Sequence, residues 1–266
     1  MNRWVLVTGG ALRLGRETCL AFARAGWNVA CHYNRSTAAA HSLGEELTVL
    51  GVKWALVPGP LDSADDADKL FKSALHCVGG ELHGIVNNAS LFEPDTAENF
   101  SERGLLAQLQ TNLIVPLTLG RMLYRHCVDS QPIAPSALVH ILDQKVFNLN
   151  PDYFSYTLSK LALERAVAQQ AQALAPLVRV NAVAPGLLYI SGPQSQENYD
   201  LASRANLLRR PIDVARVAQA TVFLADNPCI TGASLCVDNG QHLVPVPRDI
   251  MFVVDELLRG ISNEGR

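Results

Sequence analysis

The stretch WVLVTGGALRLG, residues 4–15, decides the fold class. Its first five residues are an apolar, β-rich run that predicts a strand, and Gly9 and Gly10 end that run. Apolar residues then recur at helical spacing from Leu14 until Gly26. A strand, a glycine loop and a helix in this order can hold a dinucleotide pyrophosphate on backbone amides at the helix N-terminus, although a glycine pair after a strand is sometimes only a tight turn.

The same alternation of β-rich runs and amphipathic stretches continues along the chain. Further strands are predicted at 28–33, 53–57, 83–86, 136–142, 178–183 and 234–237. Helices are predicted at 37–50, 65–78, 102–127 and 213–225, and around Tyr156; the long one is expected to bend near Pro116. This alternation predicts a single-domain α/β Rossmann fold, a doubly wound seven-stranded parallel sheet with helices on both faces.

The periodic pattern lapses after Pro185 and Gly186, and residues 187–210 are predicted to be a loop. A loop of that length inside a domain is typically a lid or a binding element, so we expect it to contact the substrate. Residues 1–243 form the domain on this interpretation, and residues 244–266 are a C-terminal extension of it. The extension is apolar at helical spacing and is expected to pack on its own subunit or on a neighbour.

Composition narrows the function classes. The chain has 266 residues, 48% of them hydrophobic, and a net charge of -3 with scattered Lys and Arg, which favours a small-molecule partner over nucleic acid or a membrane. The six cysteines show no CxxC spacing and the histidines show no metal-ligand spacing, so we expect reduced thiols and no metal. Met1 leads within three residues into the first strand, which leaves no room for a signal peptide and favours a cytoplasmic protein.

Residues 143–160, DQKVFNLNPDYFSYTLSK, contain a candidate acid site. Tyr156 and Lys160 are four residues apart in a predicted helix, so the ammonium lies one turn from the phenol on the same face. A nearby cation favours the phenolate and lowers the pKa of a tyrosine from about 10, which suits proton exchange near neutral pH. A Tyr and a Lys four residues apart also occur by chance, so the pair alone is weak evidence of a catalytic site. The predicted nucleotide-binding loop earlier in the chain supports the catalytic interpretation.

The end of the second predicted strand indicates the type of dinucleotide. An acidic residue there binds the free ribose 2′-hydroxyl of NAD(H), whereas an arginine accommodates the 2′-phosphate of NADP(H). Asn34, Arg35 and Ser36 occupy this place, with no acid. We therefore predict NADP(H); the alternative is that Arg35 is an ordinary surface cation.

Five motifs in order resemble the short-chain dehydrogenase/reductase family, from about residue 4 to about residue 242. They are TGGALRLG, NNAS at 87–90, Asn112, Tyr156 with Lys160, and PG at 185–186 followed by ITGASLCVDNG. Within that family the chain most resembles the pteridine reductases. The shared features are Arg13 in the glycine loop, the HYNRS segment at 32–36, NNAS in place of NNAG, Phe92, and Asp143 at 13 residues before Tyr156, where most members have serine.

The resemblance implies roles for individual residues. Tyr156 would protonate or position the reacting group, Lys160 would hold the nicotinamide ribose and lower the pKa of the phenol, and Asn112 would support a water relay. The implied cofactor-binding residues are Gly9, Arg13, Leu14 and Gly15 at the phosphates, Asn34, Arg35 and Ser36 at the 2′-phosphate, Asp62, Asn88, Ala89 and Ser90, and Tyr156, Lys160, Pro185 and Gly186 near the nicotinamide. The implied substrate residues are Arg13, Ser90, Asp143, Tyr156 and Phe92, whose ring would stack on a flat heterocycle unless it is a core aromatic.

These features predict a reductase that transfers hydride from NADPH to a C=N bond of a pterin, a dihydropterin or a folate-like molecule. The resemblance implies a homotetramer. The main rival is an NADPH-dependent carbonyl or 3-oxoacyl reductase, and Asp143 argues against it, because a carboxyl donates a hydrogen bond to a carbonyl only when protonated. A nucleotide-binding scaffold without activity is the third interpretation, which the intact Asn112, Tyr156 and Lys160 disfavour. Asp143 could also serve only as a cap of the loop after the fifth strand.

Overall fold

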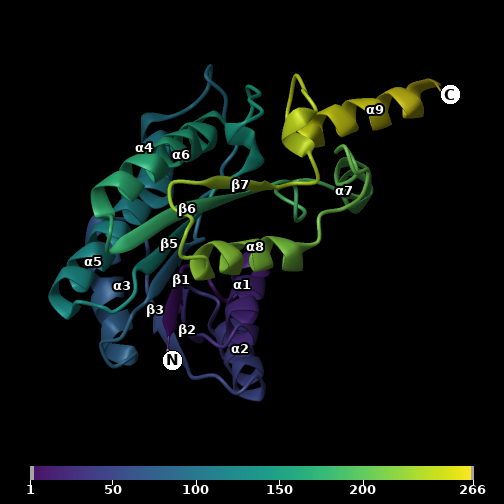
Figure 1. The fold of residues 1–266 in the computed structure, drawn as a ribbon. Helices are drawn as coiled ribbons and strands as arrows, with labels where there is room; N and C mark the ends of the chain where they lie inside the picture. Colours follow the sequence, from purple (N-terminus) through teal and green to yellow (C-terminus); the bar gives the residue numbers. More distant parts are fainter. Residues whose placement is uncertain (1–2, 265–266) are drawn as a thin grey trace.

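A single seven-stranded parallel sheet organises the computed structural model, which describes residues 3–264 (Figure 1). Its strands are β1 (Trp4–Val7), β2 (Asn28–Tyr33), β3 (Trp54–Pro58), β4 (Gly84–Asn87), β5 (Ser136–Ile141), β6 (Val178–Pro185) and β7 (Ser234–Val237). Their order is β3-β2-β1-β4-β5-β6-β7, which confirms the predicted doubly wound fold. Residues 1, 2, 265 and 266, which the predicted domain and its extension include, lie outside the described residues.

The direction in which the sheet grows reverses between β1 and β4. In an open α/β sheet, ligands bind in the crevice beyond the carboxyl ends of the strands at such a reversal. The connections after β1 and β4 carry the glycine loop and the NNAS segment, so the topology places these two predicted motifs side by side.

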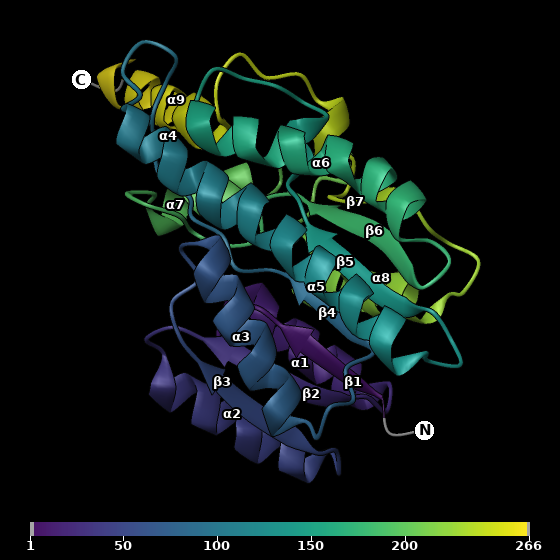
Figure 2. The same ribbon diagram turned by 90° about the vertical axis from the view of Figure 1, so that its left-hand side faces the viewer.

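Helices cover both faces of the sheet (Figures 1 and 2). One face carries α1 (Arg13–Arg24), α2 (Thr37–Val49) and α8 (Val214–Asp226), and the other carries α3 (Ala64–Cys77), α4 (Glu102–Leu109), α5 (Val115–Ser130) and α6 (Phe154–Leu174). The first layer buries residues such as Phe22, Leu43 and Val217. The second buries residues such as Leu119 and Leu163. Strands buried on both faces explain the nearly continuous apolar runs of the sequence.

The expected long helix at 102–127 is interrupted, which corrects the sequence prediction. Residues Gln110–Ile114 form a π-helical turn between α4 and α5, and the Val115 N–H donates to the carbonyl of Gln110. The interruption lies before Pro116 because proline has no N–H for the carbonyl four residues earlier, that of Asn112. Single π turns within helices are frequent at functional sites, and this one contains the predicted site residue Asn112.

The segment 187–210 is not wholly a loop, which is a second correction. It contains the helix α7 (Gln196–Ala202), and the Ser195 hydroxyl caps it by accepting from the Asn198 N–H. Seven residues span about two turns, which is too short for hydrophobic periodicity to reveal.

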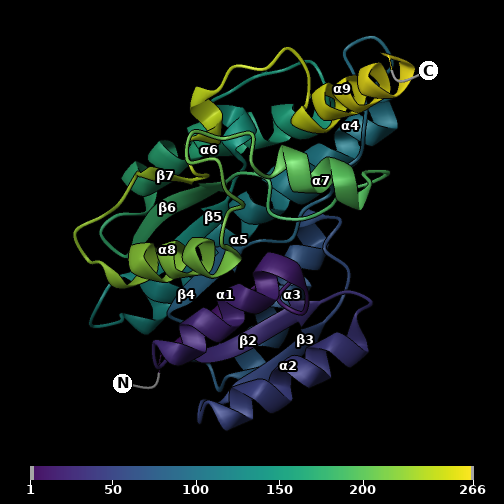
Figure 3. The same ribbon diagram turned by 90° about the vertical axis from the view of Figure 1, so that its right-hand side faces the viewer.

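The C-terminal extension packs on its own chain. Its helix α9 (Ile250–Glu264) lies beside α7 (Figure 3), and Asn198 donates to the Met251 carbonyl at 2.8 Å. Ahead of the helix, Arg248 and the Asp249 N–H both bind the Asp152 carboxylate. Within residues 3–264 no helix is long and apolar enough to cross a membrane.

The glycine loop between β1 and α1 is built by close backbone contacts. Arg13 has φ of 51°, a left-handed conformation that explains why related loops often carry glycine there. Gly15 lies against the Gly9 carbonyl, and an added methyl would overlap that oxygen and the Asn88 Nδ2. The loop therefore approaches the β4 connection more closely than any side chain at position 15 permits.

We expect Gly15→Ala to destabilise the protein by about 2 kcal/mol or more, because the overlap involves backbone that cannot rotate away. Gly104→Ala in α4 is the matched control, since its methyl meets only the Ser101 hydroxyl and should change stability by less than about 1 kcal/mol. Urea denaturation of both variants measures the difference. Equal stability of the two would contradict the close packing of the loop.

Candidate active site

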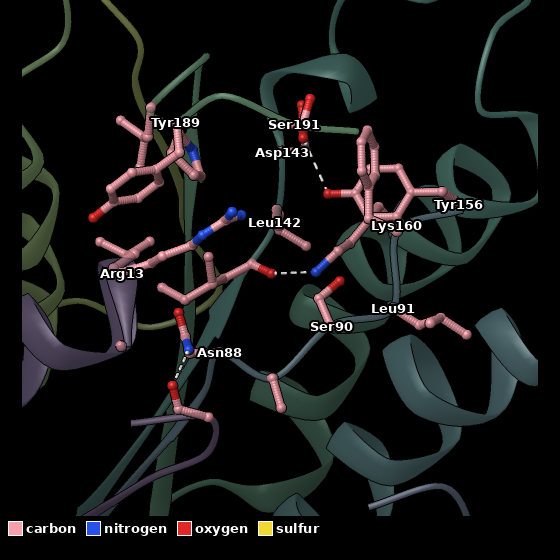
Figure 4. A pocket seen from close by; sticks show the side chains of 18 of the residues that line it. Arg13, Asn88, Ser90, Leu91, Leu142, Asp143, Tyr156, Lys160, Tyr189 and Ser191 are labelled. Atoms are coloured by element: carbon pink, nitrogen blue, oxygen red, sulfur yellow. Dashed lines mark hydrogen bonds between the residues drawn. The ribbon is translucent and has the colours of Figure 1, made fainter. Parts of the chain in front are cut away.

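A cavity of about 640 Å³ opens beyond the carboxyl ends of the strands. Most of the predicted site residues line it: Gly9, Arg13, Leu14, Gly15, Asn34, Asp62, Asn88, Ala89, Ser90, Phe92, Asp143, Tyr156, Lys160, Pro185 and Gly186. Figure 4 shows Tyr156 and Lys160 from α6 on one side of this space and Arg13 with Tyr189 on the other. The structure thus brings together residues from seven separate segments of the chain.

Three predicted residues do not line the cavity. Arg35 is exposed just after β2, and Ser36 is the residue before α2. Asn112 is fully buried behind the Ser90 loop. Arg35 and Ser36 follow the lining residue Asn34 directly in the sequence, but neither of them lines the cavity.

Buried polar contacts hold the glycine loop in place. The Gly9 N–H donates to His32 Nδ1 at 3.0 Å, and His32 Nε2 lies 3.0 Å from the Gly59 carbonyl. This arrangement requires a neutral imidazole with its proton on Nε2, and burial lowers the pKa of His32, which favours that form. On the other side, Asn88 Nδ2 donates to the carbonyls of Thr8 and Gly9. The His32 ring and the Asn88 amide therefore hold the backbone of the glycine loop in place.

Arg13 projects from the glycine loop into the cavity beneath Tyr189 (Figure 4). The guanidinium carbon lies 5.6 Å from the centre of the Tyr189 ring, within the range of a cation–π contact. Tyr189 belongs to the segment after β6, so this contact joins the predicted phosphate loop to the predicted substrate segment.

Asp143 and Tyr156 form a hydrogen-bonded pair. The Tyr156 hydroxyl donates to Asp143 Oδ2 at 3.0 Å, and the Lys145 N–H donates to Asp143 Oδ1 at 2.9 Å. Asp143 follows β5 and caps the short turn Gln144–Val146, so the capping alternative raised by the sequence is observed together with the contact to Tyr156. Both carboxyl oxygens are thereby oriented, one by the turn and one by α6.

Burial raises the proton affinity of both groups, and the Asp143 carboxyl raises that of Tyr156 further. Burial raises the pKa of Asp143 above its usual range, against the opposing charges of Lys145 and Lys160. Burial and the Asp143 carboxyl raise the pKa of Tyr156 well above that of a free phenol. The net shift in the pKa of Tyr156 is thus opposite to the one expected from Lys160, because desolvation and the adjacent carboxyl dominate it.

Lys160 is fully enclosed beside the pair. Its Nζ donates to the Ile141 carbonyl at 2.7 Å and lies 5.7 Å from the centre of the Tyr156 ring. Burial lowers the pKa of Lys160 to about 8, and the Asp143 charge opposes that shift. The side chain is thus mostly cationic at neutral pH.

Asn112 anchors the Ser90 loop to α6. Its Oδ1 accepts from the Ser90 hydroxyl and the Leu91 N–H, and its Nδ2 donates to the Leu91 carbonyl and to Ser159 Oγ. These four bonds use the full capacity of a side-chain amide. The side chain of Asn112 therefore holds the Ser90 loop against α6 in this structure, and its part in a water relay stays a prediction.

An aromatic cluster forms one wall of the site. The Phe92 ring stacks on Tyr153 with centroids 4.1 Å apart and meets Tyr156 edge-on at 4.6 Å. One face of Phe92 is thus covered by Tyr153, so a flat ligand has only the remainder of the ring available. Phe92 lines the cavity and also packs against the aromatic cluster, as a core aromatic would. Whether its ring stacks on a flat heterocycle stays a prediction.

Several lining residues were not identified from the sequence. They are Lys145, Tyr189, Ser191, Gln194, Gln241, Asp249, Ile250 and Met251. Lys145 follows Asp143 by two positions, a signal that was available, whereas Asp249 to Met251 lie beyond the family motifs. Gln241 accepts from the Leu187 N–H at 2.9 Å and so fixes the start of the segment after β6.

The structure also shows the arrangement of the metal-ligating side chains and of the cysteines. Over residues 3–264, no group of three or more His, Cys, Asp and Glu side chains could hold a metal ion. All six cysteines are free thiols: Cys19, Cys31, Cys77, Cys127, Cys229 and Cys236.

Comparison with known proteins identifies the family. The family model described as enoyl-(acyl carrier protein) reductase matches residues 10–242. Among solved structures, FolM alternative dihydrofolate reductase 1 from Brucella canis, complexed with NADP, is 34% identical over 91% of this chain and 94% of that chain, with a TM-score of 0.85. Pteridine reductase 1 of Leishmania tarentolae is 29% identical over 90% of this chain and 96% of its own length. Glucose 1-dehydrogenase of Gluconobacter oxydans is 30% identical over 90% of this chain and 91% of its own length.

These relatives share an oxidoreductase framework and differ in the substrates that their names give. The predicted resemblance to pteridine reductases is confirmed by their presence among the relatives, and the NADP bound to FolM agrees with the predicted cofactor. The match to the family model covers most of the chain, including the glycine loop from Gly10 on, Tyr156 and Lys160. The protein is therefore an oxidoreductase of the short-chain dehydrogenase/reductase family.

Proposed function

We propose that the protein is an NADPH-dependent reductase of a C=N bond in a pterin, either a dihydropterin or a folate-like molecule. The observation that carries this proposal is the bond from the Tyr156 hydroxyl to Asp143 Oδ2 inside the cavity. It joins two groups of high proton affinity where most members of the family have a tyrosine and a serine. Such a pair can deliver a proton to a ring nitrogen.

The glycine loop fits a dinucleotide. Gly9 and Gly15 leave the backbone bare against the Asn88 segment, and the loop leads into the N-terminus of α1, which favours phosphate groups. Gly9, Arg13, Leu14 and Gly15 would hold the pyrophosphate, Asn34, Arg35 and Ser36 the 2′-phosphate, and Asp62 with Asn88 to Ser90 the adenosine side. When bound, NADPH supplies the hydride of the reaction.

The residues of the chain then handle the proton. Reduction of C=N adds a hydride to carbon and a proton to nitrogen, so the nitrogen needs a donor as its negative charge develops. Tyr156 holds its proton because its pKa is raised, and Asp143 lies within hydrogen-bond distance to share or replace it. Lys160 adds a nearby positive charge, which opposes the build-up of negative charge when the proton leaves.

Asp143 favours the pterin over a simple ketone. A serine in its place would donate a neutral hydrogen bond to a carbonyl, whereas a carboxylate next to a carbonyl oxygen is repulsive unless protonated. A pterin ring carries basic nitrogens and N–H donors that a carboxyl can serve in either protonation state. Arg13, Ser90 and Phe92 would contact the ring, with Phe92 edge-on to Tyr156.

A carbonyl reductase of the same family is the alternative, and the similarity to glucose 1-dehydrogenase supports it. A scaffold without activity is disfavoured because Tyr156 and Lys160 face the same cavity as the glycine loop. The most useful experiment is a screen of NADPH oxidation over dihydropterins, dihydrofolate and simple ketones. Reduction of ketones alone would contradict the proposal, and no turnover of any class would support the scaffold.

The remaining expectations extend the proposal to the whole protein. We propose a cytoplasmic homotetramer in which residues 1–243 form the catalytic domain, 187–210 the substrate segment and 244–266 an extension of the same domain. The free thiols are consistent with a reducing compartment. Light scattering on the purified protein tests the assembly.

The first prediction from the proposed function concerns cofactor choice. Because no acid follows β2 and Arg35 lies beside Asn34, NADPH should bind at least about tenfold more tightly than NADH, a difference of about 1.4 kcal/mol. Fluorescence titration of both dinucleotides measures this, and Arg35→Ala should remove most of the preference. Equal affinities would show that Arg35 is an ordinary surface cation.

The second prediction concerns the proton donor. Tyr156→Phe removes the hydroxyl that donates to Asp143 and keeps the ring, so turnover of a dihydropterin should fall by about 10² or more with little change in NADPH affinity. Tyr153→Phe, which keeps the stack on Phe92, is the matched control and should retain at least about a third of the activity. Similar steady-state rates for both variants would mean that Tyr156 has only a packing role.

The third prediction separates pterin from carbonyl chemistry. Asp143→Asn keeps the shape and can still cap the turn, but its amide cannot relay a proton, so pterin turnover should fall by about 10². Asp143→Ser restores the usual family residue and should lose pterin activity while gaining weak ketone reduction. Rates on a dihydropterin and a diketone measure both. A wild-type pterin rate in Asp143→Asn would leave Asp143 as a cap only.

A further inference from the structure

The cavity contains a buried ion pair that the proposed reaction does not use. Lys145 Nζ lies 2.8 Å from Asp249 Oδ2, and the two side chains are 5% and 16% exposed. Both residues line the cavity. Removing an ammonium and a carboxylate from water costs free energy, which good geometry and further hydrogen bonds must offset. The contacts that hold this pair, and the groups that its charges affect, indicate what it does.

The pair joins two segments that are distant in the sequence. Lys145 stands in the short turn after β5, and its N–H binds Asp143 Oδ1. Asp249 stands just before α9, and its Oδ1 accepts from the Met251 N–H, which fixes the carboxylate at the start of that helix. The family model ends at residue 242, so Asp249 belongs to a part of this chain outside the shared framework.

Other contacts hold the ammonium of Lys145 in one place. Asn150 Oδ1 accepts from its Nζ at 3.1 Å, and the Tyr153 ring lies 5.4 Å away on another side. The backbone of Asp249 is itself tied to Asp152 by a 2.7 Å bond. The charge of Lys145 is therefore fixed and does not sample solvent freely.

This fixed charge faces the acid pair. Lys145 is the strongest opposing influence on the raised pKa of Asp143, and the Asp249 charge adds to the raised pKa of Tyr156. The other charged group packed on the pair is Lys160 from α6. The charges of two lysines thus act on the acid pair, and within the described residues Lys145 is the one paired with a carboxylate of the extension.

We propose that Lys145 and Asp249 are positioning residues that set the pH range in which the Asp143–Tyr156 pair retains its transferable proton. The assignment of that proton to the reaction rests on the proposed function. The C-terminal extension thereby takes part in the chemistry of the site: it supplies the negative charge that limits how strongly Lys145 drives Asp143 to ionise.

The sign of each effect follows from charge alone. Lys145→Met removes a positive charge, so the pair should keep its proton to higher pH. Asp249→Asn removes a negative charge and still accepts a hydrogen bond from Lys145, so the pair should lose its proton at lower pH. Opposite charges within about 4 to 6 Å shift such groups by about 1 unit or more, and we expect midpoints displaced by about half a unit or more in opposite directions.

The experiment is a pH titration of the Asp143 carboxyl by ¹³C NMR in the full-length protein, with the signal assigned from its loss in Asp143→Asn. Midpoints are compared for wild type, Lys145→Met and Asp249→Asn, and Lys145→Arg should restore the wild-type midpoint because it keeps the charge. Glu256→Gln is the control: it removes an exposed carboxylate from the same helix α9 and should shift the midpoint by less than about 0.2 unit, because solvent and salt screen an exposed charge. If Lys145→Met does not fold, the Lys145→Gln variant and Asp249→Asn carry the test.

Displacements of opposite sign support the inference, and midpoints that stay together or move in the same direction overturn it. The upper pH limit of kcat for dihydropterin reduction should move with the NMR midpoints, since the pair titrates as a unit. NMR displacements of the expected sign in a protein that reduces no pterin would contradict the proposed function and leave the inference standing. Pterin reduction by a protein whose NMR midpoints do not move would overturn the inference and leave the proposed function standing.

Discussion

The hydrogen bond from Tyr156 to Asp143 is the interaction on which the site depends. It connects the end of β5 to the first turn of α6, so the sheet and the helix must be in register for the two groups to meet at 3.0 Å. The π turn before α5 serves the same end, because Asn112 ties the Ser90 loop to Ser159, whose hydroxyl in turn donates to the Tyr156 carbonyl. Tyr156 is thus held at its hydroxyl by Asp143 and at its carbonyl by Ser159.

The electrostatics of the pair differ from the picture that the sequence suggests. Spacing alone places a lysine one turn from a tyrosine and predicts an acidified phenol. In the folded protein, burial and the Asp143 carboxyl raise the pKa of Tyr156, and Lys160 directs its ammonium to the Ile141 carbonyl. A tyrosine that keeps its proton next to a carboxyl suits proton donation to nitrogen better than a phenolate would.

Much of the fold could be predicted because its signals are local. The strand, glycine loop and helix at 4–26 are read from adjacent residues, and the spacing of Asp143, Tyr156 and Lys160 follows from one turn and one helix. A bend near Pro116 was expected, but its form as a π turn was not, because the missing N–H of a proline does not by itself fix how the helix adjusts. The short helix α7 escaped because two turns carry too little periodicity.

The contribution of the extension could not be predicted for a different reason. Asp249 meets Lys145 only because α9 packs on α7 and because Asp152 binds the chain just ahead of the helix. These contacts are tertiary, and no spacing rule links residues so far apart in the sequence. The apolar face of residues 244–266 could be predicted from helical spacing. The placement of the Asp249 carboxylate in the cavity could not.

The most direct measurement of the central claim is a crystal structure of the protein with NADP and a dihydropterin. The account predicts the reducible C=N bond in the cavity, its nitrogen within about 3.2 Å of Tyr156 Oη or Asp143, and its carbon toward the nicotinamide. A ligand ring held elsewhere, with the nitrogen beyond reach of both groups, would contradict the account.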